Sequence, residues 1–328
     1  MRLALLLLSL LAAPPAPKKA EPPPQRPHRL ELAADRELPL VGSPSLSPDG
    51  KELVFARFGV PHPRLLQRQG KLFIADLAHP EAARAIDVPG PNVRNYFRSR
   101  LSLDGTQLAY LAQGELWTRT VAEGAATRLY PPKEGDATLG PALSHFAWGP
   151  DGSWLLIQSP KGWARVAVAS GEIAPLTLPP IDLSNGSLAF EPDGRHAVFV
   201  RPRAGPGWEN GARVVVLNIE TGQAQLADFD HDYTDVLVLT DAEIIGKDSD
   251  GVLWALRGRS RLLYYRPPAP PKGASISQYS VSGDMSEIAY VVGQGNGFSY
   301  GRSEIMVGPA PVPPSRKAKR EEPPGADR

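Results

Sequence analysis

The sequence contains no cysteine. This absence excludes structural disulfides, thiolate metal ligands, a cysteine nucleophile and lipid attachment through an N-terminal cysteine. An excess of charge is also lacking, since 36 Lys and Arg residues stand against 35 Asp and Glu residues. A balanced charge gives no global field that would attract nucleic acid or an anionic membrane surface, and we expect no nucleic-acid partner.

Long apolar runs are also missing. The one apolar stretch at the N-terminus, Leu3 to Ala13, follows Arg2 and has eleven residues, whereas a membrane-crossing helix needs roughly 20. It predicts an export signal over residues 1–20, and therefore a periplasmic or secreted protein with no transmembrane segment after signal removal. Residues 21–27 are predicted to be a proline-rich linker and residues 309–328 a disordered tail, since both are rich in proline and charge.

One sequence phrase recurs along the chain as SPSLSPDGKELVFA, RSRLSLDGTQLAYLA, HFAWGPDGSWLLIQ and SLAFEPDGRHAVFV. In each copy an Asp-Gly pair, which tolerates the positive φ of a tight turn, separates two apolar strands. Two degenerate copies follow around Asp241 and Gly283. The copies recur about every 47 residues, an interval typical of propeller blades.

Each turn phrase is followed by a second pair of predicted strands, such as KLFIADL and ARAIDV after the first. Four strands per repeat predict an all-β fold, a six-bladed β-propeller over residues 28–308. A β-sandwich is the alternative, but it does not require a turn phrase at a constant interval. The last repeat is one strand short, and we predict that the segment His28 to Leu40 supplies its outer strand and closes the ring.

The turn phrases resemble the WD40-like propeller repeats of TolB-type proteins. The resemblance rests on Ser47-Pro48-Asp49-Gly50-Lys51, on Gly149-Pro150-Asp151-Gly152 and on Glu191-Pro192-Asp193-Gly194. It extends over roughly Ser43 to Val307 and does not include an N-terminal domain like that of TolB. The resemblance implies a propeller fold, which serves binding scaffolds and the non-catalytic caps of peptidases alike.

A short motif, Gly297-Phe298-Ser299-Tyr300-Gly301, fits the G-x-S-x-G pattern of serine hydrolases. In such enzymes an acid and then a histidine follow the serine in the chain. All six histidines of this chain precede Ser299. We therefore interpret the motif as a glycine-rich hairpin loop and predict no catalytic residues.

The acidic segment from Asp228 to Asp235 resembles the opening of a helix-loop-helix calcium site. That site needs glycine at its sixth position and glutamate at its twelfth, where this chain has Tyr233 and Leu239. The sequence therefore predicts no cofactor. A looser calcium or other cation site, with Asp230 and Asp232 as oxygen ligands, stays open as an alternative to a solvated acidic loop.

The predicted propeller places the turn phrases on one rim and the long, irregular segments on the opposite rim. Long loops on a rigid scaffold commonly carry binding residues, and Tyr, Trp and Arg commonly anchor interfaces. We predict one binding face formed by Arg94, Tyr96, Arg98, Trp208, Asp230, His231, Tyr233 and Tyr300.

These features favour a monomeric, exported scaffold that holds an envelope protein or peptide without covalent chemistry. One alternative is an enzyme with its site in the central channel, a lyase or hydrolase acting on peptide or glycan with loop acids and His231. Another is a purely structural role in a surface layer or secretion apparatus.

Overall fold

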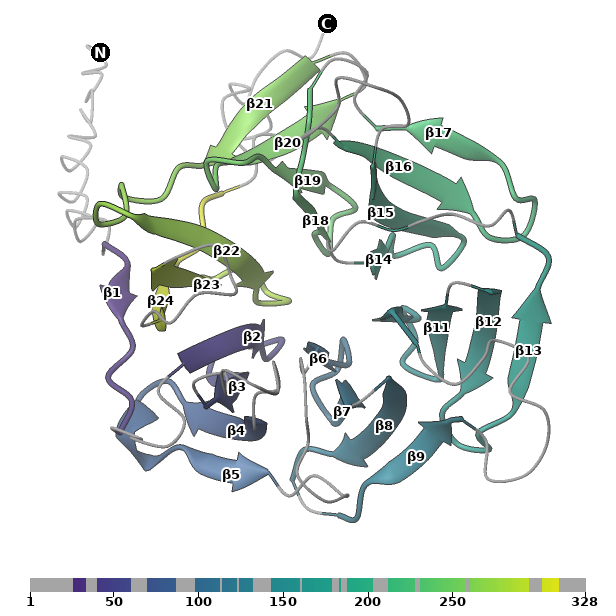
Figure 1. Ribbon diagram of the computed structural model, residues 1–328, viewed down its shortest axis with the longest axis horizontal. Helices are drawn as coiled ribbons and strands as arrows, with labels where there is room; N and C mark the ends of the chain where they lie inside the picture. The colour runs from purple at the N-terminus through teal and green to yellow at the C-terminus, as the bar shows by residue number, and fades with distance from the viewer. Residues whose placement is uncertain are drawn as a thin grey trace, which may run out of the picture.

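The computed structural model describes residues 26–33, 40–59, 70–86, 98–112, 114–122, 124–131, 143–159, 161–178, 183, 188–202, 212–227, 231–257, 260–294 and 303–312. Their strands form six separate four-stranded antiparallel sheets, arranged as blades around a central axis (Figure 1). The predicted six-bladed, all-β propeller is confirmed. The described residues also contain a short 3-10 helix, η1 (Pro80–Ala82).

The blades follow one another along the chain, and the first strand of each blade is the innermost. Blade 1 contains β2 (Leu40–Leu46), β3 (Glu52–Phe58), β4 (Gly70–Asp76) and β5 (Arg84–Ile86). Blade 2 contains β6 (Arg98–Leu101), β7 (Gln107–Ala112), β8 (Glu115–Thr120) and β9 (Thr127–Tyr130). Blade 3 contains β10 (His145–Trp148), β11 (Trp154–Ser159), β12 (Gly162–Ala167) and β13 (Ile173–Leu176).

The second half of the ring repeats this order. Blade 4 contains β14 (Leu188–Phe190), β15 (His196–Pro202), β16 (Ala212–Asn218) and β17 (Ala224–Leu226). Blade 5 contains β18 (Asp235–Val238), β19 (Ile244–Lys247), β20 (Leu253–Arg257) and β21 (Ser260–Tyr265). Blade 6 contains β22 (Ala274–Val281), β23 (Glu287–Gln294), β24 (Ser303–Pro309) and β1 (His28–Arg29).

The two ends of the described chain meet in blade 6, where the N-terminal β1 is the outer strand. His28 pairs with Val307 and Arg29 with Met306, and β1 lies beside blade 6 in Figure 1. The amide of Leu30 continues the ladder by donating to the carbonyl of Ile305 at 2.8 Å. The predicted closure by an N-terminal strand is confirmed.

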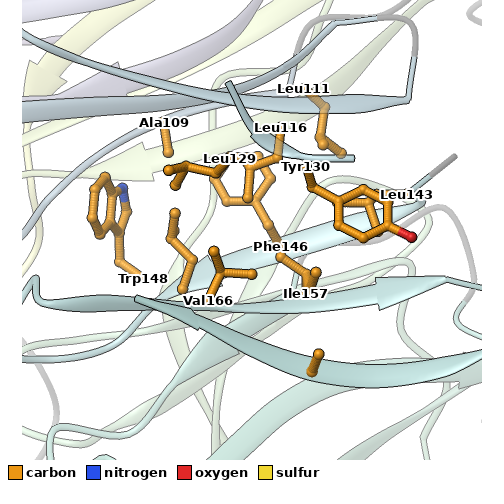
Figure 2. Close-up of a cluster of buried hydrophobic side chains, with 12 residues drawn as sticks. Ala109, Leu111, Leu116, Leu129, Tyr130, Leu143, Phe146, Trp148, Ile157 and Val166 are labelled. Atoms are coloured by element: carbon orange, nitrogen blue, oxygen red, sulfur yellow. The ribbon is translucent and has the colours of Figure 1, made fainter. Parts of the chain in front are cut away.

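The apolar core lies between blades, so each sheet depends on its neighbours. The described residues form six buried clusters, one at each blade-to-blade interface. Figure 2 shows the cluster between blades 2 and 3, where Leu116 and Tyr130 face Phe146 and Ile157. A ring packed in this way gives rigid support to the side chains that face its axis.

The turn phrases adopt the left-handed conformation that their Asp-Gly pairs predict. The glycine after each aspartate has a φ between 68° and 73° in blades 1 to 4. In the two degenerate copies the equivalent positions hold Ala242, with φ 65°, and Met285, with φ 58°. The turn of blade 6 is therefore centred on Asp284 and Met285, just after the Gly283 around which the sequence placed it.

At the C-terminal end, the described residues extend to residue 312. Strand β24 ends at Pro309, and the amide of Ala310 donates to the carbonyl of Ser286 at 2.9 Å. No helix within the described ranges is both long enough and apolar enough to cross a bilayer.

Candidate functional site

A cavity of about 600 Å³ occupies the central channel at the end where the turn phrases lie. The innermost strands of all six blades line it, and so do the turns that follow them. The strand residues in its wall include Leu46, Leu101, Trp148, Phe190, Leu237 and Val281. Residues from the turns include Pro48, Leu103, Pro150, Pro192 and Asp284.

The turn phrases at the mouth share one hydrogen-bonding pattern, which explains why the sequence repeats. In each blade the Oδ1 atom of the turn aspartate accepts a hydrogen bond from the backbone amide two residues later, at distances between 2.8 and 3.4 Å. These aspartates are Asp49, Asp104, Asp151, Asp193, Asp241 and Asp284. They hold the turn, as Asx turns generally do.

A serine two residues before the aspartate strengthens three of these turns. The hydroxyls of Ser47, Ser102 and Ser282 donate to the following carboxylate at 2.6 to 2.7 Å. These bonds, and then the backbone amide bond, lower the pKa of Asp49, Asp104 and Asp284. The three carboxylates are thereby stabilised in the charged form, which is the form that holds the turn.

Neighbouring turns touch one another around the mouth. The amide of Asp284 donates to the carbonyl of Pro48 at 2.8 Å, and a Cβ atom on Gly283 would lie 3.1 Å from the Cα atom of Pro48. Glycine thus allows the turns of blades 6 and 1 to approach closely. Because of this contact, Pro48 forms part of the rim of the cavity.

The wall of the cavity is largely apolar, and its aromatic side chains are held in place. Trp148 is 8% exposed, and its indole nitrogen donates to the backbone carbonyl of Arg100 in the next blade at 2.9 Å. Phe190 packs edge to face on Trp154, with ring centroids 5.0 Å apart. At the rim Leu103 is 50% exposed, which is unusual for a leucine in the described chain.

Six residues with hydroxyl groups line the cavity, and each hydroxyl already forms a hydrogen bond inside the protein. Several of these bonds join blades, such as that from the amide of Leu101 to Ser45 Oγ and that from the amide of Leu46 to Ser280 Oγ. Ser102 and Ser282 bond to turn aspartates, Thr240 to the carbonyl of Gly283 and Tyr279 to the carbonyl of Gly251. The hydroxyls therefore hold the ring together.

Charged side chains gather at the inner end of the cavity. Arg100 lines it, and Arg98 lies two residues earlier on the same strand, β6. Burial lowers the pKa of both arginines, and the carboxylate of Asp235, on β18 of the opposite blade, counteracts that shift (Figure 1). Burial also lowers the pKa of Lys247 on β19, again against the effect of Asp235 and of Asp248.

A separate cluster lies in the turn of blade 4. The Nδ1 atom of His196 is hydrogen bonded to Asp193 and lies 3.5 Å from a carboxylate oxygen of Glu191. One imidazole and two carboxylates form a donor set that Zn²⁺ accepts. The hydrogen bonds within the turn account for this geometry, so we assign the cluster a role in stabilising the turn.

Comparison with known proteins shows which solved structures share this fold. No family model and no curated protein matches the sequence. Among solved structures, the chain is similar to a candidate TolB from Agrobacterium tumefaciens, with a TM-score of 0.50 and 16% identity over 83% of this chain and 91% of that one. The fold is that of a TolB-type propeller.

Two further solved structures are similar at lower TM-scores. TolB from Acinetobacter baumannii matches with a TM-score of 0.41 and 15% identity over 82% of this chain and 54% of that one, so this chain spans about half of that protein. The β-propeller domain of the Trilobed protease from Pyrococcus furiosus matches with a TM-score of 0.46 and 13% identity over 84% and 86% of the two chains. At these identities the likeness concerns the fold alone.

Most of the predicted binding face lies outside the described part of this TolB-type propeller, so it stays a prediction. The same holds for the G-x-S-x-G motif at 297–301 and for the cation-ligand candidate Asp230. The face residues outside the described ranges are Arg94, Tyr96, Trp208, Asp230 and Tyr300.

The other predicted residues lie in different surroundings. Arg98 is in the channel, near the inner end of the cavity. Tyr233 is 1% exposed, and a Cβ atom on Gly246 would lie 2.5 Å from its ring, so the tyrosine packs in the core and presents no surface to a partner. The carbonyl of His231 accepts a hydrogen bond from Arg213, whose Nε atom lies 3.9 Å from Asp232 Oδ1.

The cavity at the turn rim was missed by reasoning from sequence. The signal that could have revealed it is the residue before the aspartate of the turn phrase, which is proline or leucine in blades 1 to 4: Pro48, Leu103, Pro150 and Pro192. In this propeller these four apolar residues converge on one opening.

Proposed function

We propose that this protein is an exported binding scaffold that holds a protein or peptide partner in the periplasm or outside the cell and performs no covalent chemistry. The observation that carries the proposal is the cavity in the central channel. It is large enough for a short peptide or small ligand, its wall is apolar, and the hydroxyls that line it are engaged in holding the blades together.

The side chains in the wall favour binding over reaction. Proline, leucine, valine and aromatic residues supply contact area and exclude water, but they cannot act as nucleophiles or transfer protons. The hydroxyls of Ser102 and Ser282 donate to aspartates whose pKa is low. A low-pKa carboxylate is a poor base, so these pairs are suited to holding turns.

The rim favours a polypeptide partner. Leu103 is 50% exposed beside the prolines of the neighbouring turns, and such an apolar rim on a rigid ring extends the contact beyond the cavity itself. Exposed apolar groups around a pocket are typical of protein-binding sites. The apolar run Leu3 to Ala13 supports export, which would bring the scaffold to partners in the cell envelope.

Capture from the envelope fraction of the source cell tests the proposal. The protein without residues 1–20 is immobilised and compared with Leu103→Asp and with Leu263→Asp. The two leucines are 50% and 49% exposed, but Leu103 lies at the cavity and Leu263 on the outer strand β21. We expect wild type and Leu263→Asp to retain the same partner and Leu103→Asp to lose most of it.

Equal recovery by all three proteins would contradict the placement of the binding site. A direct test of chemistry accompanies the capture, in which the protein is incubated with peptide and glycan libraries and the products are analysed by mass spectrometry. Turnover that disappears in His231→Ala would overturn the scaffold in favour of an enzyme.

A further inference from the structure

Among the described residues, positively charged side chains gather at the inner end of the cavity. Arg98, Arg100 and Lys247 all interact electrostatically with Asp235, and Lys247 also with Asp248. Only Arg100 of the three cations lines the cavity, so it is the group that a ligand arriving from the mouth would meet.

The dimensions of the cavity fit one extended chain. On blade 2, Arg100 and Leu103 both line it, and three residue steps of about 3.3 Å give a depth of about 10 Å. A volume of about 600 Å³ is ample for one extended chain over that depth. An extended chain in stacked sheets occupies about 4.7 by 10 Å, or roughly 47 Å².

We propose that the cavity binds the carboxyl-terminal end of a partner polypeptide, with its last three residues in the apolar wall and its terminal carboxylate on the guanidinium of Arg100. This inference rests on the proposed function and specifies its ligand. An amino terminus would bring a positive charge to the cationic end of the channel, and an internal loop would present no terminal carboxylate to Arg100. The carboxyl terminus supplies a negative charge at the end of a chain, which is what Arg100 can bind.

The surroundings of Arg100 strengthen such a contact. A guanidinium can bind a carboxylate through two parallel hydrogen bonds, and these bonds are stronger in a site that excludes water. The backbone carbonyl of Arg100 accepts a hydrogen bond from the Trp148 indole. The Nη1 atom of Arg100 donates to the carbonyl of Ser99 at 3.0 Å. The arginine is therefore positioned before a ligand arrives, which reduces the entropy lost on binding.

Fluorescence anisotropy with synthetic peptides tests this inference. The probe is a pool of fluorescein-labelled hexapeptides, Gly-Ser-Gly followed by three positions randomised among Leu, Ile, Val and Phe, made with a free carboxylate and, separately, with a C-terminal amide. We expect the free-acid pool to bind wild type at least tenfold more tightly than the amide pool. Arg100→Gln should reduce this ratio to about one, and Arg100→Lys should retain part of it.

Arg195→Gln is the matched control, because Arg195 is an exposed arginine on the turn of blade 4 and does not line the cavity. It should keep the wild-type ratio. Thermal unfolding of each variant confirms that the ring is intact. If Arg100→Gln does not fold, the acid-to-amide ratio on wild type, and its decrease with added salt, still decide the question.

Three outcomes would overturn the inference. In the first, both pools bind wild type equally and Leu103→Asp binds neither. This result would agree with the proposed function but would show that the terminal carboxylate has no role. Equally tight binding of an amidated pool that ends in aspartate would show that any carboxylate suffices. Binding of neither pool would also refute it, and if capture from the envelope fraction is also unaffected by Leu103→Asp, the proposed function fails with it.

Discussion

Replacing Leu30 by alanine should weaken the closure of the ring between blades 6 and 1. The other five blade-to-blade interfaces should stay as they are. Leu30 is 4% exposed and belongs to the cluster between blades 6 and 1, where it is grouped with Ile305 and Val307. It follows directly after the two residues of β1, so its side chain anchors a strand that makes few backbone bonds of its own.

The size of the effect follows from the burial of the side chain. A buried leucine replaced by alanine typically costs 2 to 5 kcal/mol, and the cost is lower where the surroundings can relax into the space. Leu30 lies on an outer strand, which can relax, so we expect a loss of about 2 to 3 kcal/mol in the free energy of unfolding. With about 2 to 4 °C per kcal/mol for a large domain, the melting temperature should fall by roughly 4 to 12 °C.

Differential scanning calorimetry of the wild type, Leu30→Ala and Glu31→Ala measures this effect. Glu31 is the adjacent residue and is exposed, so its truncation should change the melting temperature by no more than about 1 °C. Equal melting temperatures for Leu30→Ala and Glu31→Ala would refute the reasoning. They would show that burial of Leu30 contributes nothing measurable to the free energy of unfolding.

Two further predictions concern the turn phrases. Ala242→Gly should raise the free energy of unfolding by about 0.5 to 1 kcal/mol in a denaturant titration, because Ala242 has a φ of 65° that glycine adopts without strain. Ala78→Gly is the control, at an exposed position without positive φ, and it should not stabilise the protein. Hydrogen bonds lower the pKa of Asp49, Asp104 and Asp284, so their contribution to stability is complete above the unfolded value of about 3.9 and is lost as the pH falls through the folded values. The triple Asp→Asn variant should therefore lose less stability than wild type between about pH 4 and pH 2 in thermal melts, and identical pH profiles would contradict this assignment.

The sequence was sufficient to predict the architecture because the fold repeats a local rule. An Asp-Gly turn between two apolar strands is recognisable within a dozen residues, and its recurrence specifies the number of blades. The degenerate copies were also found, although Ala242 and Met285 replace glycine there, because the flanking strands keep their apolar pattern. The closing strand could be predicted from the number of strands in each repeat, because the last repeat has only three and needs a fourth from elsewhere in the chain.

The candidate site could not be predicted in the same way, because its parts are distant in sequence. The predicted face relied on long loops rich in aromatic residues and arginine, and Tyr233 shows how such a signal misleads, since it is buried in the core. The cavity is instead built from short turns. Likewise, Arg100 and Asp235 belong to opposite blades, and only the ring brings them near each other.

The pairing of His28 with Val307 also sets the order in which the molecule can be completed. Nearly the whole polypeptide must be present before β1 can meet β24, and contacts so remote in sequence form slowly. Until then the outer edge of the sixth sheet, formed by β24, is unpaired, and the flank of the first sheet is exposed to water. The ring therefore stays open at one seam until β1 pairs with β24, and only then is its channel enclosed on all sides.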